Sequence, residues 1–431
     1  MMKKQNVAKK YFLLSIFLIS FYSVSGQTSK QEIFDTPEKT GGVYYAYPVK
    51  NKIDQTAPPK GYEPFYISHL GRHGSRYLVA DADYKIVLDI FEDAYRQNAL
   101  TPLGLNVHKR LSKVWLEAEG HGGDLAPLGV QQLRGIAERM YQSYPEVFTN
   151  NTKISARSTT VIRCVLSMDA FCERLKELNP TLQTTREASN KYMSYLNFHT
   201  KEAVAFRSSK DTWREDYRIF EENHIQPKRL LNSLFSNIQY IEKNLNSKSL
   251  MLGLYEIAGG MQNIETKLSF YDLFEKEELF DLWQCRNYRL YIEYANAAQN
   301  GGIMMENAKP LLKNILDNAN EAILSNKKGA SLRFAHDGNI IPLTILLHLQ
   351  NCYNSISEQS EYYKAWSDFK IAPMAGNVQI IFFQKYNSND ILVKFLLNEK
   401  ETLIPTIKTD IAPYYHWKDV ESYYKLLLGE N

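Results

Sequence analysis

The first residues that could do chemistry form the run Arg72-His73-Gly74-Ser75-Arg76. This run places one imidazole between two guanidinium groups, whose forked N–H donors match the oxygens of a phosphate. Gly74 lacks a side chain and would let the backbone approach a ligand closely. If a helix begins here, Arg72 and Arg76 share a face near its N-terminus, where anions are favoured. The alternative interpretation is a surface turn that carries these charges by chance.

Two further clusters supply the other groups that a phosphate site needs. Arg157 follows a short predicted strand, and Arg163 lies less than two helical turns beyond it. His336 and Asp337 follow another predicted strand and place an imidazole beside a carboxylate. The alternatives are a solvated arginine in the first case and, in the second, Asp337 or Asn339 acting only as a helix cap.

Together, these residue types can transfer a phosphoryl group to an imidazole. A neutral histidine attacks phosphorus, arginines hold the three equatorial oxygens, and a carboxylic acid protonates the leaving oxygen. Because three arginines already neutralise the phosphate, this chemistry requires no metal. The sequence contains no C-x-x-C pair and no H-E-x-x-H run, so we expect no metal site, and we expect no cofactor.

Strands alternate with helices along the chain, and each cluster follows a strand. Apolar runs predict strands at 64–69, 153–156, 331–335, 378–383 and 391–397. Apolar residues at helical spacing predict helices at 127–140, 158–175, 308–323 and 341–348. This alternation indicates an α/β fold with a mostly parallel central sheet flanked by helices. Sites in such sheets lie beyond the carboxyl ends of the strands.

One long stretch interrupts the alternation. Residues 190–300 are rich in Tyr, Asn, Lys and Glu and poor in β-branched residues, which predicts an inserted, mainly helical cap subdomain. The predicted parts are a signal peptide (1–26), an N-terminal lead-in (27–60), the first part of the α/β core (61–190), the cap (191–325) and the second part of the core (326–431). Between His199 and Arg229 the cap has seven basic against six acidic residues. These bases either are simply solvated or reach extra phosphates of a polyphosphorylated ligand.

The N-terminus has the pattern of a cleaved export signal. Lys3, Lys4, Lys9 and Lys10 precede an apolar run, and small residues stand before Gln27. The run is short for the ~20 residues that cross a bilayer, so cleavage is favoured over a membrane anchor. We therefore expect a periplasmic or extracellular protein without stable membrane association.

The charge balance gives no reason to expect binding of nucleic acid. The whole chain carries 51 basic and 48 acidic residues, and four of the lysines lie in the signal peptide, so the rest is close to neutral. We expect a small phosphorylated substrate as the partner, bound by a local cluster of cations.

The four cysteines permit disulfide bonds without requiring them. Cys164 and Cys172 are eight residues apart on a predicted helix, which separates them by ~12 Å and excludes a mutual bridge. Cys285 and Cys352 could pair with each other, with either of the first two, or not at all.

From roughly Gly61 to the C-terminus, the chain resembles the histidine phosphatase superfamily, in the branch of histidine acid phosphatases, phytases and multiple inositol polyphosphate phosphatases. The resemblance rests on the R-H-G-x-R motif at Arg72–Arg76, the L-x-P-L-G-x-x-Q-like stretch Leu125–Gln132, Arg157, the H-D motif at His336-Asp337, and Pro373–Asn377. These motifs occur in the family's order over most of the chain.

The resemblance implies a role for each matching residue. His73 is the expected nucleophile, which becomes phosphohistidine, and Asp337 is expected to protonate the leaving alcohol and then to activate water. Arg72, Arg76 and Arg157 are expected to hold the phosphate, with His336 as a further donor. Arg163 competes with Arg157 for the third arginine role, and the position of Arg157 at a strand end favours it.

One departure bears on the substrate. The inositol polyphosphate phosphatase group often carries H-A-E where this chain has His336-Asp337-Gly338, although the sequence before the first motif, Gly61–His69, resembles that group. Inositol polyphosphates are the leading substrate class. The alternatives are a broad-specificity acid or sugar-phosphate phosphatase and a non-catalytic phosphate-ligand-binding protein on the same fold. A phosphomutase of the superfamily would lack the cap and the H-D pair, and Ser75 is not in the G-x-S-x-G context of a serine hydrolase.

Overall fold

The computed structural model describes residues 28–48, 53 and 55–430 of the chain. The signal peptide predicted at residues 1–26 lies outside these residues. Within the described part, no helix is long and apolar enough to cross a membrane.

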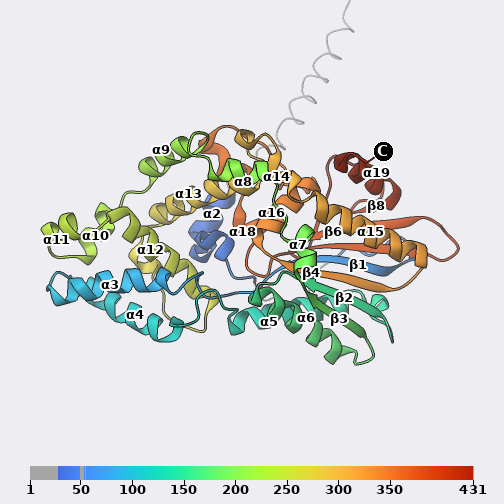
Figure 1. The fold of residues 1–431 in the computed structure, drawn as a ribbon, viewed down its shortest axis with the longest axis horizontal. Helices are drawn as coiled ribbons and strands as arrows, with labels where there is room; N and C mark the ends of the chain where they lie inside the picture. The colour runs from blue at the N-terminus through green and yellow to red at the C-terminus, as the bar shows by residue number, and fades with distance from the viewer. Residues whose placement is uncertain (1–27, 49–52, 54, 431) are drawn as a thin grey trace, which may run out of the picture.

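One mixed sheet forms the centre of the fold (Figure 1). Its strands are ordered β3-β2-β4-β1-β5-β6-β7, and β8 pairs with β6. The strands from β3 to β1 in this order are parallel, whereas β5, β6, β7 and β8 pair antiparallel. The bounds are β1 Tyr62–Arg72, β2 Lys153–Ser158, β3 Gln183–Ala188, β4 Gly329–Ala335, β5 Asn377–Lys385, β6 Ile391–Leu397, β7 Lys400–Thr402 and β8 Tyr414–His416. The predicted α/β class, with mostly parallel core strands, is confirmed. The sequence did not predict β3, because this edge strand is mostly exposed and polar.

The register of the parallel strands brings the three sequence clusters to one edge. β4 lies between β1 and β2, with Arg72 opposite Ala335 and Ser158 opposite Phe334. The residues that follow these three strands therefore meet at the carboxyl end of the sheet, where a site was expected.

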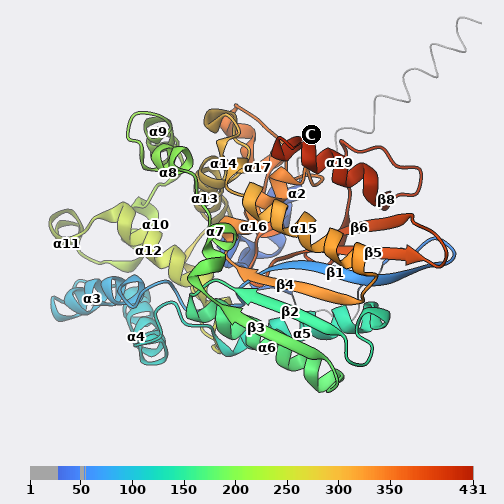
Figure 2. The same ribbon diagram turned by 45° about the vertical axis from the view of Figure 1, so that its right-hand side comes forward.

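Helices cover both faces of the sheet (Figures 1 and 2). α5 (Pro127–Ser143) and α6 (Ile162–Leu178) lie side by side on one face, where Leu133, Ile136 and Phe171 join the same apolar cluster as Ile154 and Phe334 of the strands. α15 (Lys309–Ser325), α16 (Asp337–Leu346) and α19 (Trp417–Leu428) cover the other face. The two faces thus hold two separate apolar cores.

A lobe of helices lies beyond the end of the sheet that carries the site (Figure 1). Its helices are α3 Ala82–Arg96, α4 Pro102–Ala118, α8 Lys201–Ser208, α9 Arg214–His224, α10 Lys228–Leu234, α11 Ile238–Asn244, α12 Ser247–Gly260 and α13 Lys276–Tyr294. α3 contacts α12 and α4 contacts α10, so helices from two separate stretches of the chain build this lobe. The short helices α7 Met193–Leu196, α14 Ile303–Glu306, α17 Tyr362–Ala365 and α18 Asp368–Ile371 connect the larger elements. The division into core and cap stays a prediction. In the structure, α3 and α4 lie with the cap helices, and α15 lies along the sheet.

The described part of the N-terminal lead-in begins with two short helices. α2 (Thr28–Asp35) is followed by the 3-10 helix η1 (Pro37–Tyr44), which contacts α12 and α13. Its last residues, Val43 and Tyr44, are buried next to the carboxyl end of β1. The lead-in therefore contributes a wall of the site described below.

Candidate active site

The segment Arg72–Arg76 leaves the end of β1 as a loop. The backbone N–H of Arg72 donates to the carbonyl of Gly376 at 2.8 Å, and the N–H of His73 donates to the carbonyl of Ala335 at 3.1 Å. The next helix begins only at Ala82, so the helix that the spacing of the two arginines suggested does not form. The loop is instead fixed between the end of β4 and the entry to β5.

The loop packs tightly against the first turn of α5. A β-carbon at Gly74 would lie 2.5 Å from the α-carbon of Gly129, so only glycine fits at this point. The N–H of Gly74 donates to Ser167 Oγ at 3.1 Å, and the N–H of Ser75 donates to Gln132 Oε1 at 2.9 Å. α5 and α6 thus hold the backbone that directly follows the histidine.

His73 is oriented as a nucleophile. Its Nδ1 lies 2.9 Å from the carbonyl of Gly74, which can only accept, so Nδ1 carries the proton and Nε2 keeps its lone pair. Among the described residues, Nε2 has no hydrogen-bond partner. Burial and the neighbouring cations Arg72, Arg76 and Arg163 hold the pKa of His73 well below the usual 6.5. The ring is therefore neutral at physiological pH, as attack on phosphorus requires.

Arg72 lies buried beneath the histidine with its orientation fixed. Nη1 donates to the carbonyls of Val43 and, at 2.8 Å, of Ala372. Nη2 lies 3.2 Å from Asp337 Oδ2. Nε is buried and has no hydrogen-bond partner among the described residues. An arginine held in this way has a donor left for an anion.

Arg76 and Arg163 complete the cluster of cations around His73. Arg76 stacks on the Tyr44 ring at 4.8 Å and donates to the Tyr44 hydroxyl at 3.2 Å and to the carbonyl of Tyr77 at 2.7 Å. Arg163, from the first turn of α6, donates to the carbonyl of Gly123 at 3.4 Å. Each has a buried Nε without a partner among the described residues. Burial and, after it, repulsion from Arg76 lower the pKa of Arg163.

The structure does not place Arg157 with this cluster. Its Nη1 donates to the Tyr195 hydroxyl at 3.3 Å, its Nε lies 3.4 Å from Glu187, and its guanidinium covers the Tyr192 ring at 4.6 Å. The reason is the alternation of side chains along β2, since Ile154 and Ala156 enter the core on the α5–α6 face and Arg157 points to the opposite face. Arg163, the competing candidate, is the arginine that the fold brings to His73.

His336 faces the nucleophile from the end of β4. The two imidazole rings lie 5.6 Å apart, and His336 Nε2 lies 3.3 Å from Thr159 Oγ1. Both ring nitrogens also lie within 3.8 Å of Cys164 Sγ. Burial and the three arginines outweigh Asp337 and lower the pKa of His336 to about 4. The neutral ring can donate one hydrogen bond into the site.

Asp337 is the first residue of α16, but it is not the residue that caps this helix. Asn339 Oδ1 accepts from the N–H of His336 at 3.3 Å, whereas Asp337 Oδ1 accepts only from the adjacent N–H of Gly338, at 2.9 Å. Burial alone would raise the pKa of Asp337, but Arg72, His336 and that N–H lower it below 3.8. Because 30% of its side chain is exposed, the carboxylate can reach a ligand.

Gly338, the residue after the carboxylate, packs closely against a tyrosine ring. A β-carbon at Gly338 would lie 3.1 Å from Cε1 of Tyr294, the last residue of α13. A side chain at this position would therefore require the tyrosine ring to shift by a few tenths of an ångström. The H-D-G sequence is consistent with this packing, where the related group often carries H-A-E.

Tyr44, Thr159 and Ser167 also contact the site residues, although no sequence motif assigned them a role. Tyr44 lies in the lead-in, which has no periodic pattern to indicate burial. Thr159 and Ser167 contact His336 and Gly74 from the two ends of one loop–helix segment. Ser167 could have been found, because it lies one helical turn after Arg163 and donates to its carbonyl at 2.7 Å.

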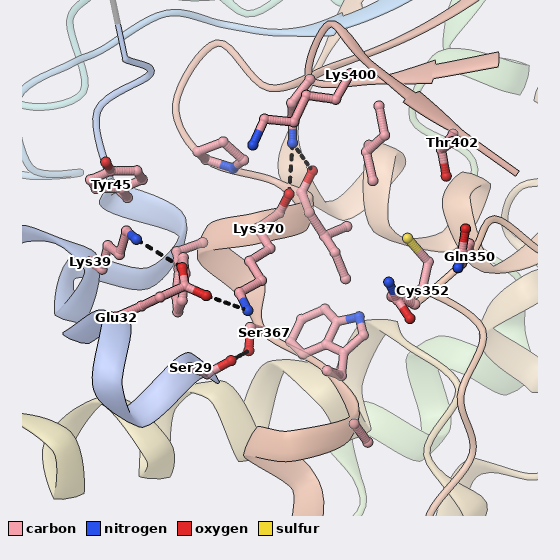
Figure 3. Close-up of a pocket in the computed structure, with 18 of the residues that line it drawn as sticks. Ser29, Glu32, Lys39, Tyr45, Gln350, Cys352, Ser367, Lys370, Lys400 and Thr402 are labelled. Carbon is pink, nitrogen blue, oxygen red and sulfur yellow. Dashed lines mark hydrogen bonds and ion pairs between the residues drawn. The ribbon is translucent and has the colours of Figure 1, made fainter. Parts of the chain in front are cut away.

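A separate cavity of about 630 Å³ lies beside the lead-in (Figure 3). Ile371 and Pro373 line it, and the Ala372 carbonyl between them accepts from Arg72, so this segment separates the cavity from the site. Glu32 accepts a hydrogen bond from Lys39 and forms an ion pair with Lys370, both at 2.8 Å (Figure 3). This cavity contains none of the residues around His73.

The described residues contain no group of three or more His, Cys, Asp or Glu side chains that could hold a metal ion. Cys164, Cys172, Cys285 and Cys352 are all buried free thiols. Cys164 is the one that contacts a site residue, His336.

The fold and this cluster define a class of enzyme. A family model for the histidine phosphatase superfamily (branch 2) matches residues 67–398, which is more than half of the chain. The protein therefore belongs to this family, as the motifs indicated, and it is a histidine-type phosphomonoester hydrolase.

Individual relatives agree with this membership. Multiple inositol polyphosphate phosphatase 1 of Gallus gallus is 24% identical over 325 residues, which are 70% of this chain and 69% of that protein. The multiple inositol polyphosphate phosphatase of Bifidobacterium longum in complex with inositol hexasulfate superposes with a TM-score of 0.77 at 19% identity, over 90% of this chain and 97% of that chain. The phytase from D. castellii superposes with a TM-score of 0.65 at 15% identity, over 91% and 88%.

Proposed function

We propose that this protein hydrolyses phosphomonoesters through a phosphohistidine at His73, with inositol polyphosphates as its leading substrate class. The observation that carries the proposal is the arrangement around Nε2 of this residue. Within the described part of the chain, a neutral imidazole with a free lone pair lies among three arginines that each keep a buried Nε donor without a partner. Such a set of donors fits a phosphoryl group, whose equatorial oxygens spread the negative charge.

In the first step, Nε2 of His73 forms a bond to phosphorus while the bond from phosphorus to the ester oxygen breaks. Arg72, Arg76 and Arg163 hold the phosphoryl oxygens, with His336 as a further donor. The leaving oxygen takes a proton from Asp337 and departs as an alcohol. Arg163 takes the role first expected of Arg157.

In the second step, Asp337 is a carboxylate and takes a proton from water. The water oxygen bonds to phosphorus as the N–P bond breaks, which releases inorganic phosphate and restores neutral His73. The carboxylate is then protonated and ready for the next leaving group. One group thus serves as acid and then as base, as its position beside the nucleophile permits.

The substrate class is supported by the relatives. Two of them are named for inositol polyphosphates and one as a phytase, and one was solved with inositol hexasulfate bound. The test is phosphate release from a panel of inositol hexakisphosphate, sugar phosphates, nucleotides and p-nitrophenyl phosphate. The highest kcat/KM is expected for inositol hexakisphosphate. A higher value for sugar phosphates would favour the broad-specificity alternative, and no release from any ester would favour a binding protein.

We also propose that the protein is exported and loses residues 1–26. The basic and apolar pattern of this segment supports the proposal. Mass spectrometry of the protein recovered from the cell envelope or medium should find Gln27 at its N-terminus. An intact Met1 in that fraction would contradict cleavage.

A further inference from the structure

We propose that Asp368, the buried first residue of α18, is the positioning residue for Arg72 in the phosphate site. The inference rests on the proposed function and deepens it, because it explains how one of the phosphate-holding arginines keeps its orientation. Asp368 acts through two backbone carbonyls that accept hydrogen bonds from the guanidinium.

These two carbonyls come from distant parts of the chain. Nη1 of Arg72 donates to the carbonyl of Val43, in the last turn of η1, and to the carbonyl of Ala372, directly after α18. Because Nη1 carries two N–H bonds, both are used, and the guanidinium cannot rotate without breaking one of them. This orientation places Nη2 3.2 Å from Asp337 Oδ2 and leaves Nε without a partner among the described residues.

Asp368 holds both residues that supply these carbonyls. Its Oδ2 accepts from the N–H of Val43 at 3.1 Å, although the two residues are 325 positions apart in the sequence. Its backbone carbonyl accepts from the N–H of Ala372 at 2.9 Å. Val43 and Ala372 thus each donate to Asp368 and accept from Arg72. A displacement of Asp368 therefore moves both anchors of the guanidinium.

The surrounding chain fits closely around the carboxylate. Gly42 has a φ of +57°, and a β-carbon at this position would overlap Asp368 Oδ2, so glycine is required on both counts. On the other side, Oδ1 accepts from Trp283 Nε1 at 2.9 Å and from the N–H of Phe369 at 2.8 Å. The N–H of Asp368 donates to Asn287 Oδ1 at 2.9 Å. Two side chains of α13 therefore fix Asp368 in place.

A carboxylate suits this arrangement better than an amide does. Three N–H donors share its two oxygens, whereas an amide offers one oxygen and one NH2 group. The residue is fully buried, where an unsatisfied polar group is costly. Burial raises the pKa of Asp368, and the Trp283 hydrogen bond and the charge of Arg286 act against this rise. All three contacts of the side chain are with donors, which favours the ionised form.

Asp368→Asn should loosen Arg72 without changing the size of the buried residue. Oδ1 accepts two of the three hydrogen bonds, so the amide should keep its oxygen there and turn its NH2 group towards the N–H of Val43. Two donors then face each other, and Val43 moves away with its carbonyl. Arg72 loses one of its two anchors, and its remaining donors lose their fixed direction.

The test is a double-mutant cycle in the full chain, with Asp368→Asn, Arg72→Ala and the double variant. Asp368→Asn alone should lower kcat/KM on p-nitrophenyl phosphate by roughly 10- to 100-fold, the value of a misplaced charge-assisted contact. In the Arg72→Ala background the same substitution should lower it by less than about 2-fold, because the residue through which Asp368 acts is gone. Equal losses in the two backgrounds would show a role in stability alone and would overturn the inference. An unchanged rate in Asp368→Asn would overturn it too.

Asn179→Ala is the matched control for the loss of a buried hydrogen bond. Asn179 is 9% exposed, and its Nδ2 donates to the carbonyl of Phe148 at 2.9 Å. It follows the last turn of α6, whose 17 residues span ~25 Å from the turn that carries Arg163. Asn179→Ala should lower the melting temperature and leave kcat/KM unchanged.

Gly42→Ala provides a second route to the same displacement. Its β-carbon would push against Oδ2 and shift the lead-in while the charge of Asp368 is kept. Its loss in kcat/KM should also disappear in the Arg72→Ala background. If Asp368→Asn does not fold, the cycle with Gly42→Ala decides, and additive losses in that cycle would overturn the inference.

A binding measurement separates this inference from the proposed function. Calorimetry should show that Asp368→Asn raises the Kd of inorganic phosphate roughly 10-fold in the wild-type background and leaves it unchanged in the Arg72→Ala background. A wild-type protein that hydrolyses no ester would contradict the proposed function. In that case the binding cycle alone decides, and additive effects on the Kd, or none, would overturn the inference.

Discussion

Replacing Asp337 by Asn separates proton donation from every other role of this side chain. Asn keeps the size of the residue and an oxygen that can accept from the N–H of Gly338. It removes the carboxylic proton and the charge that lies 3.2 Å from Arg72. Because the N-cap of α16 is His336 and Asn339 completes its capping box, the helix should form as before.

The size of the effect depends on the leaving group. General acid catalysis is typically worth ~10²–10⁴-fold, and an alkoxide requires it whereas a nitrophenolate hardly does. We expect Asp337→Asn to slow phosphoenzyme formation from inositol hexakisphosphate or glycerol phosphate by about this factor and from p-nitrophenyl phosphate by far less. Substrate affinity should be kept or increased, because Arg72 loses its competing anion.

The pH dependence follows from the direction of the pKa shifts. In the free enzyme the pKa of Asp337 is lowered, mainly by Arg72 acting against burial, so the carboxylate is ionised above pH 3.8. We expect a bound phosphate to neutralise that arginine and so to raise the pKa of Asp337. The acid form exists below the pKa in this complex, so the rate on alkyl phosphates should fall as pH rises through it. His73, with a pKa well below 6.5, should stay neutral across most of this range.

The assay is rapid-quench measurement of the first-turnover burst, which isolates phosphorylation from the slower water attack. Wild type and Asp337→Asn are compared on both ester types from pH 4 to 8, after a melting experiment has shown that both unfold at the same temperature. In the variant, the falling limb on alkyl phosphates should disappear. Equal loss of burst rate on both ester types would refute proton donation, and an unchanged burst on both would make Asp337 a structural residue only.

Three further predictions concern the two candidate arginines, one buried ion pair and the independence of the reaction from metal. Arg163→Gln should lower kcat/KM on every ester by roughly 10- to 100-fold, the value of a charge-assisted contact, whereas Arg157→Gln should change it little; the opposite order would restore the role first expected of Arg157. Glu399→Gln should lower the free energy of unfolding in denaturant by about 3–5 kcal/mol, because it removes the buried carboxylate charge that accepts two hydrogen bonds from Arg139; a change below about 1 kcal/mol would show that the pair relaxes. Exhaustive chelation should leave the steady-state rate unchanged, and a rate restored only by a divalent ion would contradict a metal-free mechanism.

The sequence predicted those strands in which consecutive residues are buried. The strand predicted at 391–397 coincides with β6, and the strands before the first and third clusters were found because both of their faces are largely buried. β3 was not predicted, because this edge strand is mostly exposed and its sequence therefore lacks a run or alternation of apolar residues. The α2–η1 lead-in was missed because its contacts are with α12, α13 and α18, far away in sequence.

The sequence indicated the chemistry of the site, but it did not show where every side chain points. A motif states which side chains are close in sequence, and strand register decides which of them point to the same place. Arg157 stands at a strand end, yet the alternation of β2 turns it away, while Arg163 points back from α6. Tyr44 and Asp368 carry no motif, because their roles come from packing between the lead-in, α13 and α18.

The central claim is that His73 becomes covalently phosphorylated. Wild-type protein should be mixed with [³²P]-labelled substrate, quenched in base, and analysed for label that is stable to alkali and released by acid. The account predicts one such label per chain on the peptide that contains residue 73, and none in a folded His73→Ala variant that also lacks turnover. Turnover in that variant, or label on another residue, would contradict it.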